Sequence, residues 1–361
     1  MASLASRVRL ELKLSSQRQY FAVVLLFILA TTAVFASAIG AVVIPVEKIF
    51  RALIASVQFS SQAILTELET TVLYSIRLPR VILAIAVGAC LAVSGAAMQA
   101  LFRNPLADPG LLGVSSGAAL FAVASIVLGQ SFFSNQYQAI AAYLLPACAF
   151  FGALLSTVFI YQLARVRQRL QVATLLLAGI AINALAGVGI GVMTYISDDR
   201  ELRAMSFWQM GSLGNASWEL LLPFMPLVFI SLWLLLKQSK KLNLYLLGEV
   251  EAAHLGVNVQ RLKRLTIVAT ALGVGASVAI AGGIGFVGLV IPHCVRLLFG
   301  PDNRWVLPMS CVLGAVLMLV ADIFARTLVT PAELPIGLVI ATIGAPFFLV
   351  LLQQQVRRGR L

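Results

Sequence analysis

The residue types that most often do chemistry in proteins are few and scattered in this sequence. The four cysteines stand singly in apolar runs and lack the spacing of metal ligands: Cys90, Cys148, Cys294 and Cys311. His254 and His293 are the only histidines, and the expected topology places both toward the cytoplasm. No nucleophile, dyad or metal constellation is apparent at membrane depth. We therefore predict no catalytic residues and no metal site, and we interpret the cysteines as small packing residues.

The sequence also lacks the motif that would let the chain use ATP by itself. A P-loop cradles nucleotide phosphates with the backbone and lysine of G-x-x-x-x-G-K-[ST]. That motif is absent, and none of the six lysines is followed by Ser or Thr. Any ATP-driven work must therefore draw on another subunit. Because no nucleophile, dyad or metal constellation is found either, the chain is predicted not to be an enzyme.

Charged residues inside apolar runs are equally rare. Asp322 is the only acid expected within a membrane span, and Arg326 follows it one turn later. Ion-coupled transporters usually carry charged or unwound segments near the membrane midplane. Asp322 is expected near an outer end instead, so an ion-coupled secondary transporter is disfavoured but stays open.

Three arginines, Arg77, Arg80 and Arg326, fall at helix ends on the expected outer face. Membrane orientation gains nothing from cations there, so they need another explanation. In one interpretation Arg326 pairs with Asp322 and the other two snorkel to lipid headgroups. The other interpretation comes from the family resemblance given below, which implies that their planar guanidinium groups bind carboxylates of a partner.

The elements that must position these residues are membrane helices. Hydrophobic residues make up 60% of the chain and charged residues 11%, and the mean hydropathy is +0.98. Such a chain cannot be solvated as a water-soluble globule. The net charge of +12 suggests nucleic acid at first sight, but a positive-inside distribution explains it without that partner.

Apolar runs long enough to cross a bilayer predict ten spans. They are residues 20–46, 81–102, two runs between Asp108 and Arg165 around a polar break at 129–138, 170–197, 220–236, two runs within 265–295 separated at 282–285, 305–326 and 334–355. The predicted fold is an all-α, polytopic membrane protein with a single transmembrane domain over residues 1–361.

The connecting segments predict the topology. Residues 1–19 are a basic flank before an uncleaved first helix, and Arg165, Arg167 and Arg169 form a basic turn. The segment 237–264 and the arginine-rich C-terminus complete the predicted cytoplasmic side. Residues 47–76, with a short helix, and 198–219, with interfacial aromatics, are expected outside. Both termini are then cytoplasmic.

An internal duplication is visible at a shift of 187 positions. Six small or turn-forming residues recur without a gap: Gly88, Ala89, Ala92, Gly95, Pro105 and Gly113 match Gly275, Ala276, Ala279, Gly282, Pro292 and Gly300. With five helices between the copies, the repeat is inverted. The crowding of small residues in 81–102 predicts that this helix is central in the bundle.

Long ordered motifs along nearly the whole chain resemble those of one family. They are Arg-Leu-Pro-Arg at 77–80, and the segments 94–99, 104–113, 283–293 and 332–337. These motifs are similar to the BtuC-like or FecCD family, the permease subunits of ATP-binding-cassette (ABC) importers for vitamin B12, ferric siderophores and heme.

The resemblance implies three sets of functional residues. Binding-protein docking would fall to Arg77, Arg80 and Arg326. Coupling to the ATPase would fall to Gly248, Glu249, Ala252, Leu255 and Gly256 in the loop 237–264. The translocation pathway would be lined by Gln171, Val172, Ala173, Asn183 and Met193, for which ordinary bundle packing is the alternative.

The resemblance also implies partners and a cargo. The expected assembly in the bacterial inner membrane is a homodimer of permeases with two ATPase subunits, which use ATP and Mg²⁺, and a periplasmic substrate-binding protein. Residues 197–218 look most like the external loop of heme permeases. We therefore expect heme import, with ferric siderophores or vitamin B12 as the alternatives and no cofactor bound by this chain.

Overall fold

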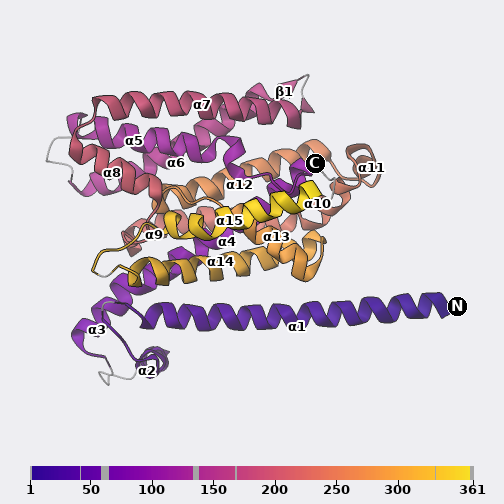
Figure 1. The fold of residues 1–361 in the computed structure, drawn as a ribbon, viewed down its shortest axis with the longest axis horizontal. Helices are drawn as coiled ribbons and strands as arrows, with labels where there is room; N and C mark the ends of the chain where they lie inside the picture. The colour runs from indigo at the N-terminus through magenta and orange to yellow at the C-terminus, as the bar shows by residue number, and fades with distance from the viewer. Residues whose placement is uncertain are drawn as a thin grey trace.

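Apolar helices make up most of the chain. The computed structural model describes residues 2–40, 42–57, 65–132, 138–166, 169–329 and 331–357. Within these ranges the apolar helices are α1 (Ala2–Ala38), α4 (Leu78–Phe102), α5 (Val114–Phe132), α6 (Gln138–Leu163), α7 (Val172–Ile196), α9 (Trp218–Lys237), α12 (Val259–Ala281), α13 (Val287–Phe299), α14 (Asn303–Thr327) and α15 (Ile336–Arg357). They pack as one bundle (Figure 1). The predicted all-α, polytopic fold class is confirmed.

Short elements lie in the connections. They are α2 (Val46–Val57), α3 (Glu67–Thr71), a π-helical turn η1 (Val72–Arg77), a 3-10 turn η2 (Pro109–Leu112), α8 (Asp199–Met210), α10 (Ser239–Leu246), α11 (Glu249–His254), and the strands β1 (Arg165–Val166) and β2 (Arg169–Leu170). The two strands form an antiparallel hairpin in which Arg165 pairs with Leu170.

The apolar helices differ in how much membrane they can cross. Among the described residues, seven helices are long and apolar enough to span a bilayer, and α5, α13 and α15 contribute shorter apolar stretches. Because a helix rises about 1.5 Å per residue, the 13 residues of α13 cover only ~20 Å of a ~30 Å hydrocarbon core. The predicted short eighth helix is therefore a partial span.

Helix α4 is the centre of the bundle, as its small residues predict. In its most apolar window 89% of the residues are buried inside the chain. A Cβ atom placed on Gly95 would lie 2.0 Å from the carbonyl oxygen of Gly288, and one on Gly88 would lie 2.2 Å from that of Gly314. The backbones of α13 and α14 approach α4 too closely for any side chain at these two positions.

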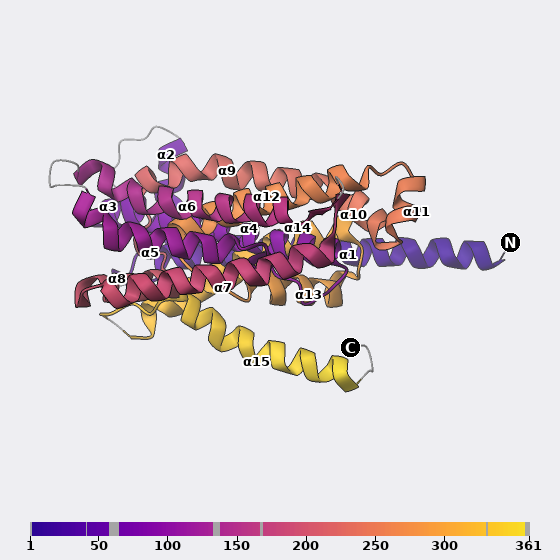
Figure 2. The same cartoon turned by 90° about the horizontal axis from the view of Figure 1, so that it is seen from above.

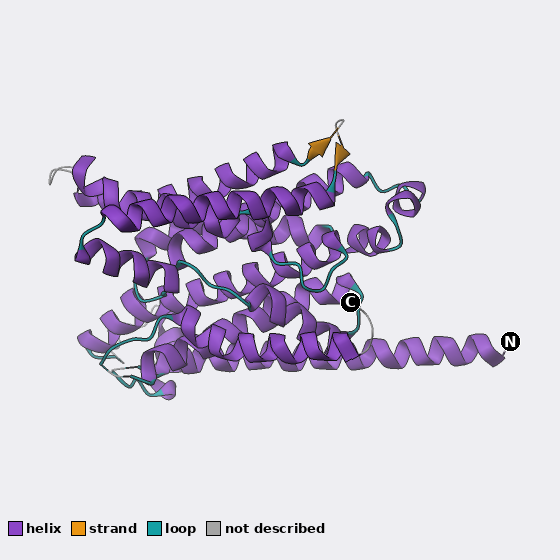
Figure 3. Cartoon of the chain, turned by 45° about the horizontal axis from the view of Figure 1, so that its top comes forward, coloured by secondary structure: helices purple, strands orange, loops and turns teal. Residues whose placement is uncertain are grey.

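Different short elements lie at the two ends of the bundle. Helices α10 and α11, the β1–β2 hairpin and both chain ends lie at one end, which we name the α11 end (Figures 1 and 3). Helices α2, α3 and α8 lie at the other, the α8 end. At the α11 end α1 projects beyond its neighbours, and α15 slants away from the bundle toward its C-terminal end (Figure 2).

The two copies of the sequence repeat run in opposite directions. Helix α4 starts at the α8 end, whereas α12, which carries the matching residues, starts at the α11 end (Figure 1). They are the second and the seventh of the apolar helices along the chain. This arrangement agrees with the predicted inverted repeat.

Several predicted boundaries were wrong. The first span was expected to reach residue 46, but α1 ends at Ala38, before the helix breakers Gly40 and Pro45. Residues 259–264 of the predicted 237–264 loop belong to α12, because Asn258 caps that helix by accepting the backbone N–H of Arg261 at 2.9 Å.

Connections predicted as loops are also more ordered than expected. The segment 198–219 contains α8. Where one short helix was expected in 47–76, the described residues hold most of α2, all of α3 and most of the π-helical turn η1. The basic turn near residue 167 is a hairpin, although Arg167 itself lies outside the described residues, as do Arg358, Arg360 and residues 133–137 of the polar break.

Candidate functional site

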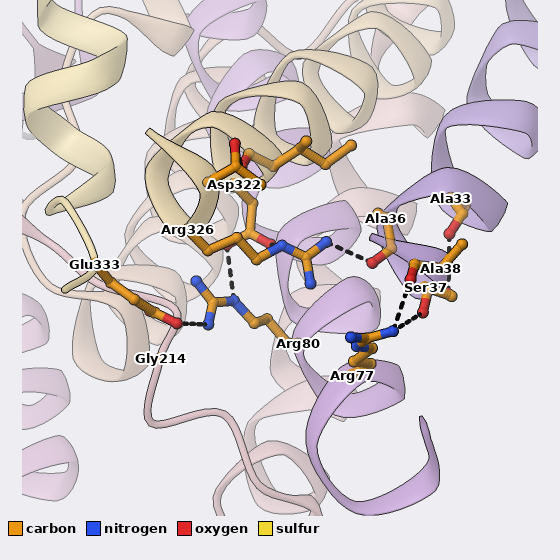
Figure 4. A network of polar contacts seen from close by, with 12 residues as sticks. Ala33, Ala36, Ser37, Ala38, Arg77, Arg80, Gly214, Asp322, Arg326 and Glu333 are labelled. Atoms are coloured by element: carbon orange, nitrogen blue, oxygen red, sulfur yellow. Dashed lines mark hydrogen bonds and ion pairs between the residues drawn. The ribbon is translucent and has the colours of Figure 1, made fainter. Parts of the chain in front are cut away.

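Arg80 is the centre of a charged cluster at the α8 end. From the first turn of α4, its Nε donates to Oδ1 of Asp322 on α14 at 2.8 Å, and its terminal nitrogen donates to Oε1 of Glu333 at 2.9 Å. Glu333 lies in the connection between α14 and α15 (Figure 4). One guanidinium group therefore joins the start of α4 to two acids that lie 242 and 253 positions later in the sequence.

Two further arginines complete this cluster, which we name the outer arginine cluster (Arg77, Arg80, Asp322, Arg326 and Glu333). Arg326 lies 3.6 Å from Asp322 and donates to the carbonyl oxygen of Ala36. Arg77 donates to the carbonyl oxygens of Ser37 and Ala38 at 2.8 and 2.9 Å (Figure 4). These carbonyls lie at the C-terminal end of α1, where cations satisfy unpaired acceptors.

All three arginines are buried. Arg77, Arg80 and Arg326 are 4, 6 and 8% exposed. Arg80 and Arg77 therefore do not snorkel to headgroups, while the predicted pair of Arg326 with Asp322 is present. Their guanidinium groups have partners inside the chain, and Glu333, with its side chain 45% exposed, is the open member of the outer arginine cluster. Docking of a binding protein on these arginines stays a prediction.

The predicted coupling residues surround α11 at the opposite end. Gly248 precedes the helix at φ 144°, and Gly256 follows it at φ 82°, so both positions use backbone conformations that favour glycine. Ala252 is fully buried and anchors the helix, whereas Leu255 is 57% exposed. Val250 within the helix and Leu247 just before it are also exposed, which gives this short helix an apolar surface that no described part of the chain covers.

Glu249, the first residue of α11, is held by two donors. Its Oε1 accepts from Nζ of Lys263 at 2.6 Å and from the hydroxyl of Tyr245 at 2.9 Å. Burial raises the pKa of Glu249, but these hydrogen bonds together outweigh it, so the pKa lies below the usual value. Arg103, the residue that follows α4, stacks 4.5 Å from the Tyr245 ring and donates to the carbonyl oxygen of Tyr245 at 2.7 Å.

The predicted pathway residues all belong to the beginning or one side of α7. Gln171 is the N-cap residue and accepts from Thr174 at 3.1 Å. Asn183 accepts from Ser116 of α5 at 2.5 Å, and Met193 packs against a small cluster around Val123. Val172 and Ala173 open the helix. Asn183 and Met193 thus contribute to packing, and the pathway role of all five stays a prediction.

Metal ligands do not gather anywhere in the part of the chain that the structure describes. No group of three or more His, Cys, Asp or Glu side chains is placed to hold an ion. The four cysteines are free, and Cys90 is buried in the bundle. His254 lies in α11 and His293 in α13, where the His293 ring contacts Phe347.

Comparison with known proteins places this geometry in a family. Residues 25–354 match the FecCD transport family, a range that includes the outer arginine cluster and α11. The chain belongs to the FecCD transport family. The resemblance read from the sequence is confirmed.

Members of the FecCD family are similar to this chain over most of its length. The hemin transport system permease protein HmuU of Yersinia pestis is 50% identical over 287 residues, which are 79% of this chain and 84% of that protein. The vitamin B12 import system permease protein BtuC of Klebsiella pneumoniae is 44% identical over 287 residues, 80% of this chain and 84% of that protein.

A solved structure confirms the fold. A metal-chelate type ABC transporter in an inward-facing conformation superposes with a TM-score of 0.78 at 34% identity, covering 91% of this chain and 97% of that one. The bundle described above is therefore the fold of an ABC permease.

Two residues of these sites were missed from the sequence. Glu333 stood inside a quoted family motif, at 332–337, but its bond to Arg80 joins positions 253 residues apart. Lys263 was read as one cation of a basic loop, although it is buried and bonded to Glu249. The available signal was its helical spacing before Ile267, Thr270 and Val274, which lie on the buried face of α12.

Proposed function

We propose that this chain is the permease subunit of an ABC importer that moves heme from the periplasm to the cytoplasm of a bacterium. The single observation that carries the cargo is the 50% identity to a hemin permease over 79% of the chain. The identity to a vitamin B12 permease over a similar range is lower, at 44%. Import also fits the family, whose members here are transport permeases.

Energy for transport is proposed to come from two ATPase subunits that bind ATP and Mg²⁺. The sequence holds no P-loop, so the chain has no such site of its own. The exposed apolar residues Leu247, Val250 and Leu255 on and beside α11 offer a surface for those subunits. In this assignment Gly248 and Gly256 flank the coupling helix α11. Ala252 packs it against the bundle, and Glu249 bonds it to Lys263 of α12.

The α11 end is proposed to face the cytoplasm. It carries Lys240, Lys241, Arg261 and Arg264, which agrees with the positive-inside distribution. Both chain ends lie at the same end and are then cytoplasmic too. The α8 end faces the periplasm, where a substrate-binding protein docks over the outer arginine cluster.

The complex is proposed to contain two copies of this chain. Helix α7 has no charged residue and leaves Leu177, Ile180 and Val188 more than half exposed. A second copy related by a twofold axis would cover part of this face, with the pathway between the copies. Gln171, Val172, Ala173, Asn183 and Met193 would then lie along the pathway.

A different cargo is the second candidate, because solved and curated relatives include a metal-chelate type transporter and vitamin B12 permeases. The test uses a host deleted for heme synthesis and for its own uptake genes, carrying this permease with its binding protein and ATPase. Growth on external heme is expected. No growth on heme, together with rescue by a ferric siderophore or by cobalamin in matched auxotrophs, would replace heme as the cargo.

The energy source is tested separately in sealed vesicles. ATP supplied at the ATPase side should drive uptake of cargo, and an imposed proton gradient without ATP should not. Uptake driven by the gradient alone would favour the ion-coupled transporter that the sequence left open.

A further inference from the structure

A buried lysine joins α11 to the segment that precedes α7. Lys263 on α12 is 2% exposed, and burying its charge is unfavourable unless hydrogen-bonded partners compensate. It has two: Oε1 of Glu249 at 2.6 Å and the carbonyl oxygen of Leu170 at 3.2 Å. The Tyr245 ring centre lies 5.9 Å from the same ammonium group.

Side chains of α12 bond both backbone groups of Leu170, its carbonyl oxygen and its N–H. While its carbonyl accepts from Lys263, its N–H donates to Oε1 of Gln260 at 3.0 Å. Leu170 ends strand β2, and the next residue, Gln171, is the N-cap of α7. The position where α7 begins is therefore fixed through α12.

The Glu249 end of the link lies on a surface element. Glu249 opens α11, and its side chain is 44% exposed. The exposed Val250 lies on the same short helix, and the exposed Leu255 directly follows it. The two segments that Lys263 bonds thus have different roles in the proposed assembly. Helix α11 contacts the ATPase, and the start of α7 lies along the pathway.

We infer that Lys263 is a positioning residue that transmits displacement of α11 to the β1–β2 hairpin and the start of α7. Movement of Glu249 shifts the ammonium group, and the ammonium group is bonded to the Leu170 carbonyl next to Gln171. An ATPase that moves α11 would thereby move the cytoplasmic end of α7. This inference rests on the proposed function, since it assigns α11 to an ATPase.

The test compares K263M, E249Q and K241M in the full complex with its ATPase and binding protein, reconstituted in lipid. K263M removes the charge and keeps a long side chain. K241M is the matched control, because Lys241 on α10 is exposed. The readouts are heme transported per ATP hydrolysed, and the ATP-dependent change in hydrogen exchange over residues 164–176.

In K241M both readouts should equal those of the unaltered complex. In K263M, ATP hydrolysis should continue while heme transported per ATP falls by about tenfold, a typical size for coupling between two sites. The ATP-dependent change in exchange at 164–176 should disappear. E249Q should show the same loss in smaller degree, because a neutral amide still accepts from Lys263.

Two results would overturn the inference: K263M and E249Q transporting heme per ATP as efficiently as K241M, or both retaining the ATP-dependent change in exchange. If K263M does not assemble, E249Q keeps Lys263 in place and decides the question with the same readouts. Failure of the proposed function can be told apart from failure of this inference. In the first case the unaltered complex would not transport heme with ATP, and the exchange measurement would still test whether Lys263 connects α11 to residues 164–176.

Discussion

Asp322 holds two arginines with one buried carboxylate. It is 1% exposed, accepts from Arg80 of α4 at 2.8 Å and lies 3.6 Å from Arg326 of its own helix. Arg80 is shared with Glu333, which leaves Arg326 dependent on Asp322 and on the carbonyl oxygen of Ala36. A neutral side chain at position 322 would leave the buried positive charges of Arg80 and Arg326 without this carboxylate as a partner.

The substitution Asp322→Asn should therefore destabilise the protein strongly. Removing one partner of a buried ion pair typically costs ~3 to 5 kcal/mol, because the remaining charge is left uncompensated. Thermal unfolding of the purified protein in detergent measures the effect. Asp199→Asn is the matched control, since Asp199 is exposed in the first turn of α8. Equal melting temperatures for the two variants would refute the role given to Asp322.

The bond between Glu249 and Lys263 predicts a pH dependence. The pKa of Glu249 is lower in the folded protein than in the unfolded chain, so the bond stabilises the fold above the ordinary glutamate pKa of about 4.3. That contribution is lost as pH falls through the lower folded value. The difference in stability between the unaltered protein and E249Q should be constant from about pH 8 to pH 5 and shrink below that range. A difference that changes near neutral pH would contradict it.

At the scale of helices, close backbone contact decides which positions accept a side chain. Gly95 of α4 faces the Gly288 backbone of α13, and neither backbone can move without displacing its whole helix. Gly191 of α7 has open space where a Cβ would lie. The two glycines therefore form a matched pair.

Gly95→Ala should destabilise the protein, and Gly191→Ala should not. Overpacking of a close contact costs about 1 to 3 kcal/mol, whereas alanine in place of glycine in an open helix position gains roughly 0.5 to 1 kcal/mol. Thermal inactivation of both variants in the same detergent separates the two cases. Equal stability would mean that α4 and α13 are less closely packed than described.

Apolar helices could be predicted from the sequence because hydropathy and length are properties of each segment alone. The separation of α12 from α13 at residues 282–285 was read from its glycines and is confirmed. The end of α1, the β1–β2 hairpin and α8 could not be placed, because contacts with other segments and local caps decide them. Asp198, for example, caps α8 through its bond to the N–H of Glu201 at 2.7 Å.

The sequence pointed to candidate site residues, but it could not show which side chains or carbonyl groups they bond. Resemblance supplied Arg77, Arg80 and Arg326, and charge patterning could pair only Arg326 with Asp322, which lies one turn away. The bond from Arg80 to Asp322 joins residues 242 positions apart, so only the packing of α4 against α14 reveals it. The same holds for Lys263 and Leu170, which are 93 positions apart.

At the scale of the whole molecule, Glu333 already binds Arg80, one of the arginines that a docking partner would use. Its carboxylate is bonded to Arg80 and is the exposed member of the outer arginine cluster. If a binding protein brings carboxylates to this cluster, they compete with Glu333 for Arg80. Glu333→Gln should then tighten capture of the loaded binding protein, and the reversals Arg77→Glu and Arg80→Glu should weaken it.

Affinity of the purified binding protein for the permease in nanodiscs measures both effects. Because Arg80→Glu also breaks the buried pair with Asp322, affinity is compared only for variants whose thermal unfolding shows that they are folded. For the folded reversals the expected loss is ~2 to 5 kcal/mol, as for charge pairs broken at an interface. Glu219→Gln, an exposed acid in the first turn of α9, controls for the change in net charge. Unchanged affinity in Glu333→Gln and in both reversals would remove these arginines from the docking surface.

The π-helical turn at Val72–Arg77 acts as a phase shift between α3 and α4. In it the N–H of Leu78 bonds to the carbonyl oxygen of Leu73, so this stretch holds one residue more than an α-helix of the same length. The surplus residue rotates α3 by roughly 100° relative to α4. That rotation aims Glu69 at Lys48, which it meets at 2.8 Å. Deletion of a single residue here would leave the apolar length of α4 unchanged, but it would rotate α3 about the helix axis and point Glu69 away from Lys48.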